Sequence, residues 1–313
     1  MKAIVAGGAG FVGSHLAKRL LKEGWDVLVI DNLSSGHSHN IPKGAEFKEL
    51  DLTDGERIKE FSTGSVDAVF HLASPVSLEI TFEKPIENFE TNDLSTMFLL
   101  QWCMKNNVKK FIYASSKNVY GKADSVYVDE TDAICPSSPY SVAKVSSEKL
   151  CQTYQNKGME TTSLRLFDIY GPGQDLDNVY RGMVGIYMAF VARNEPIAVK
   201  WPQDHFRDFV FVGDAVDAFY RCLDSNASGK VYNVATGRKV FVWQLIDHVI
   251  ETFGHVPEEY PKSFIAQTMQ DQFELYGNAC LIEKELGWKP MVSLEEGLIM
   301  MSPWVKELIE FDE

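Results

Sequence analysis

A glycine-rich turn, Gly7-Gly8-Ala9-Gly10-Phe11-Val12-Gly13, separates two predicted elements near the start of the chain. The apolar run 3–6 before it is typical of a short buried strand, and the leucines of residues 14–21 after it recur at helical spacing. A second apolar run, 27–30, ends in Asp31. Glycines let a backbone turn sharply and approach a pyrophosphate, a helix N-terminus faces that anion, and an acid at the second strand end binds a ribose hydroxyl. The four features together predict a dinucleotide-binding unit rather than an ordinary tight turn.

Asp31 also indicates which dinucleotide binds. A carboxylate at this strand end repels a 2′-phosphate, and the following segment, Asn32-Leu33-Ser34-Ser35-Gly36, has no arginine to bind one. The sequence therefore favours NAD over NADP. Asp51-Leu52 follows another strand-like stretch and is a candidate for holding the adenine, although an aspartate after a strand is also a common turn or helix cap.

Composition argues against several kinds of partner. The 313 residues carry a net charge of −14, with 45% hydrophobic and 24% charged residues, as in an ordinary soluble globular protein. Nucleic acid and anionic membranes need a basic surface, so we expect neither as a partner. No apolar run reaches the roughly 20 residues of a membrane-spanning helix. The five cysteines have no metal-type spacing, so we expect reduced thiols, a cytoplasmic protein and no bound metal.

Strand-like runs alternate with helical patterns through the first half of the chain. This alternation predicts an α/β protein with a doubly wound, Rossmann-like parallel sheet and a smaller, interlocked C-terminal substrate lobe. We expect residues 1–169 to form the NAD-binding domain, with 208–236 completing its sheet, and residues 170–313 to form mainly the substrate lobe. The predicted strands are 3–6, 27–30, 68–72, 111–114, 162–166, 209–212 and 232–235, and a helix is predicted over 181–193.

Tyr140 and Lys144 lie four residues apart in a predicted helix. Ser138 is a good N-cap and Pro139 a good first helical residue, so the helix should begin there and place both side chains on one face. The lysine ammonium and a positive nicotinamide would both lower the pKa of the tyrosine from about 10. A tyrosine tuned in this way takes a proton from a sugar hydroxyl while a hydride leaves the same carbon. An incidental pair on a surface helix is the alternative, and the dinucleotide turn argues against it.

Ser115 and Ser116 follow the predicted strand 111–114. Open α/β sheets bind ligands at the carboxyl ends of their strands, so a serine hydroxyl here is placed to bind the reacting oxygen. A serine that only satisfies loop amides is the alternative reading.

Further motifs run through nearly the whole chain in one order. They are His71-Leu72-Ala73, Asn92, Val119-Tyr120-Gly121, Tyr170-Gly171-Pro172, Arg207-Asp208-Phe209, Tyr232-Asn233-Val234 and Leu286-Gly287-Trp288-Lys289-Pro290. With the glycine turn and the Tyr140–Lys144 pair, they resemble the extended short-chain dehydrogenase/reductase family of NAD-dependent epimerases and dehydratases. The resemblance is greatest to the UDP-glucose 4-epimerase group.

The resemblance implies an NAD that stays bound through the catalytic cycle and a nucleotide-diphosphate sugar as substrate. It assigns Ser116, Tyr140 and Lys144 to the catalytic triad. Ser116 also counts among the substrate-binding positions with Asp168 and Arg207, whose guanidinium suits a diphosphate. The positions it assigns to cofactor binding are Gly7, Gly10, Phe11, Val12, Gly13, Asp31, Asn32, Ser35, Asp51, Leu52, Leu72, Ala73, Ser74, Asn92, Ser115, Tyr140 and Lys144.

The family also implies a homodimer formed by two helices from each subunit. We expect these helices at 93–104 and 141–154, where an antiparallel bundle would use the apolar positions. Packing of the same positions against the sheet is the alternative. The candidate contacts are Met97, Leu100, Val145 and Leu150.

Three departures from the family pattern affect the substrate. The family usually has asparagine where this chain has Asp168, and a carboxylate suits a diphosphate poorly unless it is protonated or turned away. The arginine common shortly before the acid matching Asp271 is absent from 267–271, and the usual Gly-Asp-Gly is replaced within 200–206, where Lys200 or His205 is a candidate for the missing charge. Ser116 is followed by Lys117-Asn118 instead of the Asp-Glu pair with which sugar dehydratases eliminate water, so dehydration is disfavoured.

We therefore expect an NAD-dependent epimerase that inverts C4 of a nucleotide-diphosphate sugar through a transient 4-keto intermediate, of the UDP-glucose/UDP-galactose type. Another activity of the same fold is the alternative: a sugar decarboxylase, a keto-sugar reductase, or an epimerase acting on an atypical substrate. A non-catalytic NAD-binding sensor or scaffold is a third reading. Retention of Ser116, Tyr140 and Lys144 argues against it.

The position of Asp31 gives a testable prediction. Direct binding measurements should show NAD preferred over NADP by at least about tenfold, which is roughly 1.4 kcal/mol, because the carboxylate repels the added phosphate. Equal affinities for the two dinucleotides would contradict the assignment.

Overall fold

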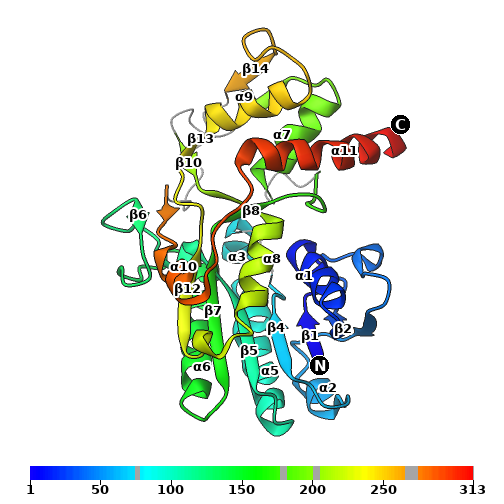
Figure 1. Cartoon of the computed structure of the whole chain (residues 1–313), viewed down its shortest axis with the longest axis vertical. Coiled ribbons are helices and arrows are strands. Elements are labelled where there is room, and N and C mark those ends of the chain that lie inside the picture. Colours follow the sequence, from blue (N-terminus) through cyan, green and yellow to red (C-terminus); the bar gives the residue numbers. More distant parts are fainter. Residues whose placement is uncertain (75–77, 177–181, 200–204, 265–273, 313) are drawn as a thin grey trace.

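A parallel sheet of seven strands forms the lower half of the molecule in Figure 1. The computed structural model describes residues 1–74, 78–176, 182–199, 205–264 and 274–312. The strand order is β12-β7-β5-β4-β1-β2-β3, and every neighbouring pair is parallel. The strands are β1 Lys2–Ala6, β2 Asp26–Asp31, β3 Glu46–Glu49, β4 Ala68–His71, β5 Lys110–Ser116, β7 Glu160–Leu166 and β12 Lys230–Val234. This sheet confirms the predicted fold class, and its order reverses between β1 and β4.

Helices cover both faces of the sheet and build the upper lobe. They are α1 Phe11–Lys22, α2 Gly55–Glu60, α3 Leu78–Glu83, α4 Pro85–Phe89, α5 Ser95–Lys105, α6 Pro139–Gln155, α7 Met183–Ala192, α8 Val212–Arg221, α9 Val242–Thr252, α10 Cys280–Leu286 and α11 Leu294–Asp312. Side chains of a strand alternate between its two faces, so Ala3 and Val5 of β1 join the core that includes α1 and α8, whereas Ile4 and Ala6 join the core that includes α2 and α5. Both faces of the sheet are therefore covered, as its continuous apolar strands require.

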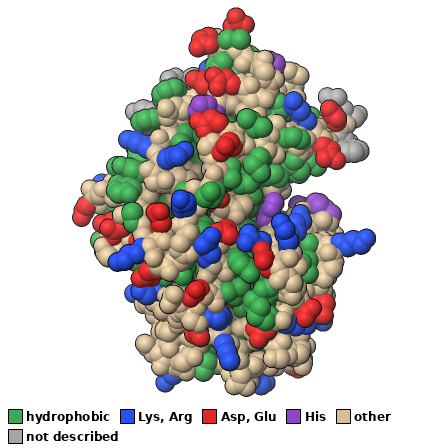
Figure 2. All heavy atoms as spheres, in the orientation of Figure 1, with side chains coloured by type: hydrophobic (Ala, Val, Ile, Leu, Met, Phe, Trp, Pro, Cys, Tyr) green, Lys and Arg blue, Asp and Glu red, His purple; other side chains and the backbone are tan. Residues whose placement is uncertain are grey.

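The upper lobe in Figure 1 contains three mutually packed helices, α7, α9 and α11, and the described residues also form four short strand pairs outside the central sheet. The pairs are β10 Phe206–Arg207 with β13 Val240–Phe241, β11 Phe209–Phe211 with β8 Asp168–Tyr170, β14 Lys262–Phe264 with β9 Ile197–Val199, and β15 Tyr276–Gly277 with β6 Tyr127–Val128. The carboxyl ends of the central strands face this lobe. Figure 2 shows a notch between the C-terminal helix above and histidine side chains below.

One predicted strand has a different partner from the one we expected. The run 209–212 does not return to the central sheet, because β11 pairs with β8 in a separate small sheet. The central sheet is instead completed by β12, which pairs with β7. A short apolar run indicates a strand but carries no information about its neighbour, and β8 continues directly from β7 into the upper lobe. The helix predicted over 181–193 begins at Met183 among the described residues.

The apolar stripe predicted for a dimer contributes to this chain's own core. Leu100 is fully buried in the core on the α5 side of the sheet, and Leu150 packs against that same core. Exposed apolar side chains lie instead on α3, α4 and α6, which contact one another. They are Phe82, Ile86, Phe89 and Val142.

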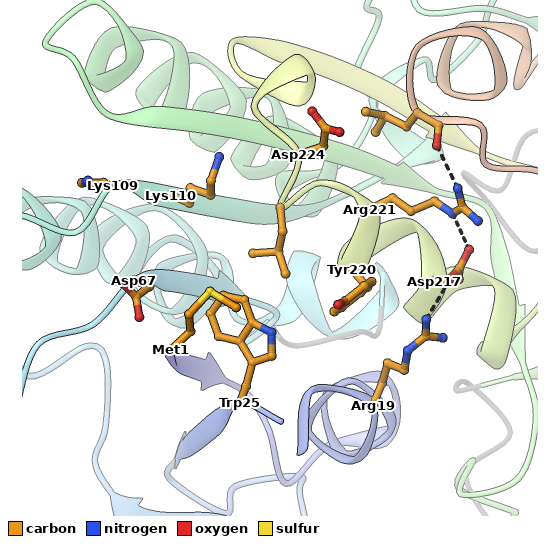
Figure 3. Close-up of a pocket in the computed structure, with 12 residues that line it drawn as sticks. Met1, Arg19, Trp25, Asp67, Lys109, Lys110, Asp217, Tyr220, Arg221 and Asp224 are labelled. Atoms are coloured by element: carbon orange, nitrogen blue, oxygen red, sulfur yellow. Dashed lines mark hydrogen bonds and ion pairs between the residues drawn. The ribbon is translucent and has the colours of Figure 1, made fainter. Parts of the chain in front are cut away.

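A cavity of about 640 Å³ lies at the opposite edge of the sheet, near the amino ends of β1 and β5 (Figure 3). Three of its charged lining residues pair with one another: Asp217 accepts from Arg221 Nε at 2.6 Å and lies 3.4 Å from Arg19 Nη2. This cavity is separate from the predicted site residues, which gather at the carboxyl ends of the strands.

Candidate active site

Backbone atoms pack closely against two glycines of the glycine turn. Gly7 has φ of +81°, and a Cβ there would lie 2.6 Å from the Ala73 nitrogen at the end of β4. A Cβ at Gly13 would lie 2.1 Å from the Gly7 carbonyl oxygen, so neither position tolerates a side chain. Gly10 caps α1 without a side-chain hydrogen bond, and an added Cβ would meet only the Gly7 carbonyl oxygen, at 3.3 Å. The first backbone amides of α1 can therefore donate hydrogen bonds to an anion, and the turn fits the pyrophosphate of a dinucleotide.

The Asp31 carboxylate is held by the backbone around it. It accepts hydrogen bonds from the Ala9 amide at 3.0 Å and the Leu33 amide at 2.9 Å. Asp51 accepts from Asn32 Nδ2 at 3.0 Å and from the Thr53 amide at 2.8 Å. Burial raises the pKa of Asp51, but the hydrogen bonds from Thr53 and Asn32 outweigh it, so the net shift is downward. Both acids stand at the carboxyl edge of the sheet beside the turn.

The remaining predicted cofactor residues differ in what their side chains bind. Ser74 Oγ donates to Asn92 Oδ1 at 2.7 Å, and Asn92 in turn donates to the Asn88 carbonyl at 3.0 Å. Ser115 Oγ donates to Glu148 Oε1 at 2.5 Å, so this hydroxyl points into the protein interior. Leu52 is buried in the core, Phe11 and Val12 form the first turn of α1, Asn32 and Ser35 are exposed after β2, and Leu72 and Ala73 follow β4.

The structure brings Ser116, Tyr140 and Lys144 together. Ser138 forms a capping box at the start of α6 with Pro139 in the first turn, as predicted. The Tyr140 hydroxyl lies beside the side chains of Ser116 and Ser74, both of which act to lower its pKa. Lys144 Nζ donates to the Ala114 carbonyl at 2.9 Å and lies 5.5 Å from the centre of the Tyr140 ring. A phenol, a hydroxyl and an ammonium therefore share one buried corner at the end of β5.

Burial dominates the proton affinities in this corner. It raises the pKa of Tyr140 to about 12, although Ser116 and Ser74 act to lower it. Burial also lowers the pKa of Lys144 to about 7, against the opposing effect of the Asp93 and Glu148 carboxylates. Burial therefore acts against the lowering that the sequence predicts from Lys144 and a bound nicotinamide. A phenolate in this interior loses its solvation by water, a cost that the spacing of residues does not reveal.

Asp168, predicted from the sequence to bind substrate, lies between two cations. Lys117 Nζ donates to Asp168 Oδ2 at 2.5 Å, and Arg207 Nε lies 4.0 Å from Asp168 Oδ1. Arg207 is buried, and its Nη1 donates to the Phe206 carbonyl at 2.8 Å. Burial, Arg207 and Lys117 lower the pKa of His205 to about 3, so His205 does not supply the missing positive charge at neutral pH. Lys200 and residues 267–271 lie outside the described residues.

Two residues of this site were not singled out from the sequence. In the sequence Lys117 is marked only by its departure from a dehydratase pattern, yet it neutralises the unusual Asp168. A charged residue directly after Ser116, at the end of a predicted strand, is a sequence signal that could have identified Lys117 as part of the site. Glu148 accepts from both Arg165 and Ser115, and nothing in the sequence marks it apart from its place one helical turn after Lys144.

Two further kinds of feature are missing from the described part of the chain. It holds no cluster of three or more His, Cys, Asp or Glu side chains suited to a metal ion. Its helices include none with the length and apolar character needed to cross a membrane.

The doubly wound sheet, the glycine turn and the Tyr140–Lys144 pair define a dinucleotide-dependent α/β enzyme class. Residues 3–235 match the NAD dependent epimerase/dehydratase family. The chain belongs to this family, as the sequence motifs predicted, and its cofactor is NAD.

Similar proteins catalyse more than one reaction. The chain is 31% identical over 310 residues to a putative UDP-glucose 4-epimerase of Methanocaldococcus jannaschii, covering 97% of this chain and 98% of the relative. It is 30% identical over 330 residues to a UDP-N-acetyl-alpha-D-glucosaminuronate decarboxylase of Bacillus cytotoxicus, covering 98% of each. Its fold matches a UDP-glucose 4-epimerase from Thermotoga maritima, solved with UDP-glucose, with a TM-score of 0.94 and 32% identity over 99% of this chain and 100% of that one.

The buried lysine predicts a pH-dependent stability in the cofactor-free protein. The folded-state pKa of Lys144, about 7, lies below the ordinary 10.5, so between these values the unfolded chain binds more protons and stability rises with pH. The raised pKa of Tyr140 acts in the opposite sense only above its ordinary value of 10.0. Urea unfolding at pH 7 and pH 9.5 measures this effect. Between the two pH values, the free energy of unfolding of wild type should rise by more than about 1.4 kcal/mol relative to that of Lys144→Met.

Lys149→Met, at an exposed position on the same helix, is the control and should follow wild type at both pH values. If Lys144→Met also parallels wild type, the lysine is not titrating in this window.

Proposed function

We propose that this protein is an NAD-dependent 4-epimerase of a nucleotide-diphosphate sugar, of the UDP-glucose/UDP-galactose type, acting through a transient 4-keto intermediate. The observation that carries the proposal is the position of the Tyr140 hydroxyl beside Ser116, in the same buried corner as Lys144. This corner lies at the same edge of the sheet as the glycine turn. The similarity to two UDP-glucose 4-epimerases along nearly the whole chain supports it.

In this proposal Tyr140 takes the proton of the C4 hydroxyl. Ser116, which lies beside the phenol, hydrogen-bonds the same sugar oxygen and holds it in line. NAD, when bound, supplies the hydride acceptor at C4 and returns the hydride. The Lys144 ammonium stabilises negative charge on the buried phenol, which burial alone disfavours. Inversion follows if the keto sugar presents its other face before the proton and hydride return.

Arg207 is the proposed ligand of the substrate diphosphate. Its guanidinium is fixed by the Phe206 carbonyl and lies beside Asp168, the other proposed substrate residue. A planar guanidinium binds two phosphate oxygens at once, which suits this role. The cofactor contacts predicted from the sequence, including Asp31 and Asp51, belong to the same proposal.

Decarboxylation of a nucleotide-linked uronic acid is the second candidate, favoured by the similarity to the Bacillus cytotoxicus decarboxylase. Oxidation at C4 by Tyr140 and NAD would serve both reactions, since a 4-keto group also activates the loss of a carboxylate. Turnover on a panel of UDP-hexoses and UDP-uronic acids, with sugar products separated and released CO₂ measured, distinguishes the two.

The protein is further proposed to be cytoplasmic, with residues 170–313 forming mainly the substrate lobe.

We also propose that the protein is a homodimer. The exposed apolar side chains of α3, α4 and α6 form the surface available for a helical bundle, in place of the buried Leu100. Burying such a surface between two copies accounts for its exposure in one chain. Sedimentation at micromolar concentration should give a dimer, and a monomer would reject this proposal.

Replacing Tyr140 tests the catalytic assignment. Tyr140→Phe removes only a hydroxyl, so NAD should still bind, while turnover should fall by about 10²–10⁴-fold, the usual contribution of a positioned acid–base group. Lys144→Ala should slow turnover and in addition weaken NAD binding. Steady-state rates and NAD titration on the same preparations measure both effects.

Tyr127→Phe, at an exposed tyrosine of β6, is the matched control and should leave turnover unchanged. If Tyr140→Phe keeps turnover within about threefold, which is about 0.65 kcal/mol of barrier, the tyrosine is not the acid–base group.

A further inference from the structure

Lys117 is a buried cation directly after the proposed catalytic serine. It opens a short turn, Lys117–Val119, at the carboxyl end of β5, and 9% of its side chain is exposed. Burying an ammonium with one carboxylate partner costs free energy that the pair does not always recover. Burial accordingly lowers the pKa of Lys117, while Asp168 acts to raise it. A charge kept at this position calls for a reason beyond stability.

Asp168 explains where that charge is needed. Its carboxylate is 28% exposed and lies 4.0 Å from Arg207 Nε, so an anion bound by Arg207 would meet a negative group at close range. A carboxylate only accepts hydrogen bonds, and it repels a second anion that is bound close to it. Lys117 Nζ, bound to the other carboxylate oxygen at 2.5 Å, offsets that repulsion. An ammonium has three N–H donors, so this pairing leaves donors for a ligand.

The other charged groups nearby are engaged differently. The Asp208 carboxylate accepts from the backbone amides of Thr236 at 2.9 Å and of Gly237 and Gly277 at 3.0 Å. Glu274 accepts from the Phe206 amide at 3.1 Å and lies 3.4 Å from His205. Of the three carboxylates of Asp168, Asp208 and Glu274, that of Asp168 is the one whose described partners are cationic side chains. Lys117 is the closer of these two partners.

We propose that Lys117 is a substrate-binding residue that, as a unit with Asp168, contacts the diphosphate held by Arg207. The proposal rests on the nucleotide-sugar function above. Lys117 supplies a donor to the anion and keeps Asp168 from opposing it. The ligand class is a nucleoside diphosphate, and the alternative is a purely structural ion pair.

UDP binding to the NAD-saturated protein, measured by calorimetry, separates these two roles. Asp168→Asn removes the opposing charge and keeps Lys117, so UDP should bind at least as tightly as to wild type. Lys117→Met with Asp168→Asn leaves no unpaired buried charge, and it should bind UDP at least about tenfold more weakly than Asp168→Asn alone, roughly 1.4 kcal/mol. Lys117→Met alone, which exposes the ligand to an unmasked carboxylate, should be the weakest. Lys122→Met, at an exposed lysine five residues further on, is the control and should match wild type.

The order of affinities decides the outcome. A structural pair predicts that Asp168→Asn and Lys117→Met weaken UDP binding alike, or that neither changes it, and either result overturns the proposal. Equal affinity in Asp168→Asn and in the double variant also overturns it while leaving the epimerase proposal standing. If wild type binds no UDP, the nucleotide-sugar function itself fails, and the role of Lys117 fails with it.

Discussion

The buried carboxylate of Glu148 connects the elements on which the site depends. It lies in α6 one turn after Lys144, and it accepts from Arg165 Nε at 3.0 Å and Nη2 at 2.9 Å, on β7, and from Ser115 Oγ at 2.5 Å, on β5. The helix that carries Tyr140 and Lys144 is thereby fixed against the strand that ends in Ser116. Removing one member of such a group leaves an uncompensated charge in the interior, so the geometry is strongly enforced.

A parallel sheet collects polar side chains at one edge, and burial there changes their chemistry. The turn after β1, the end of β4 and the serines at the end of β5 converge because the carboxyl ends of parallel strands share that edge. Burial at this edge makes a phenolate at Tyr140 costly and makes Lys144 easier to deprotonate. A positive charge beside Tyr140 acts against the first effect because it stabilises a phenolate, but it makes Lys144 still easier to deprotonate.

The two halves of the molecule are constrained to different degrees. The cofactor half is a regular sheet in which Gly7 and Gly13 have no room for a side chain. The upper lobe is built from helices and two-stranded sheets, and the Asp208 carboxylate there accepts hydrogen bonds from three backbone amides. Side chains of such a lobe can change without disturbing the glycine turn. This is consistent with epimerases and a decarboxylase among proteins about equally similar to this chain.

The sequence by itself determined the fold class, the NAD turn and the helix start at Ser138, because local spacing and glycine chemistry define those features. It also predicted that Tyr140 and Lys144 share a face, since residues four apart on a helix must. Only the tertiary structure decided that β12 rather than β11 completes the sheet, that Leu100 is internal, and that Lys117 pairs with Asp168. Strand partners, burial and ion pairs between residues 51 positions apart depend on how distant segments pack. The direction of the Tyr140 pKa shift was decided in the same way, because desolvation is a property of the assembled interior and not of neighbouring residues in the chain.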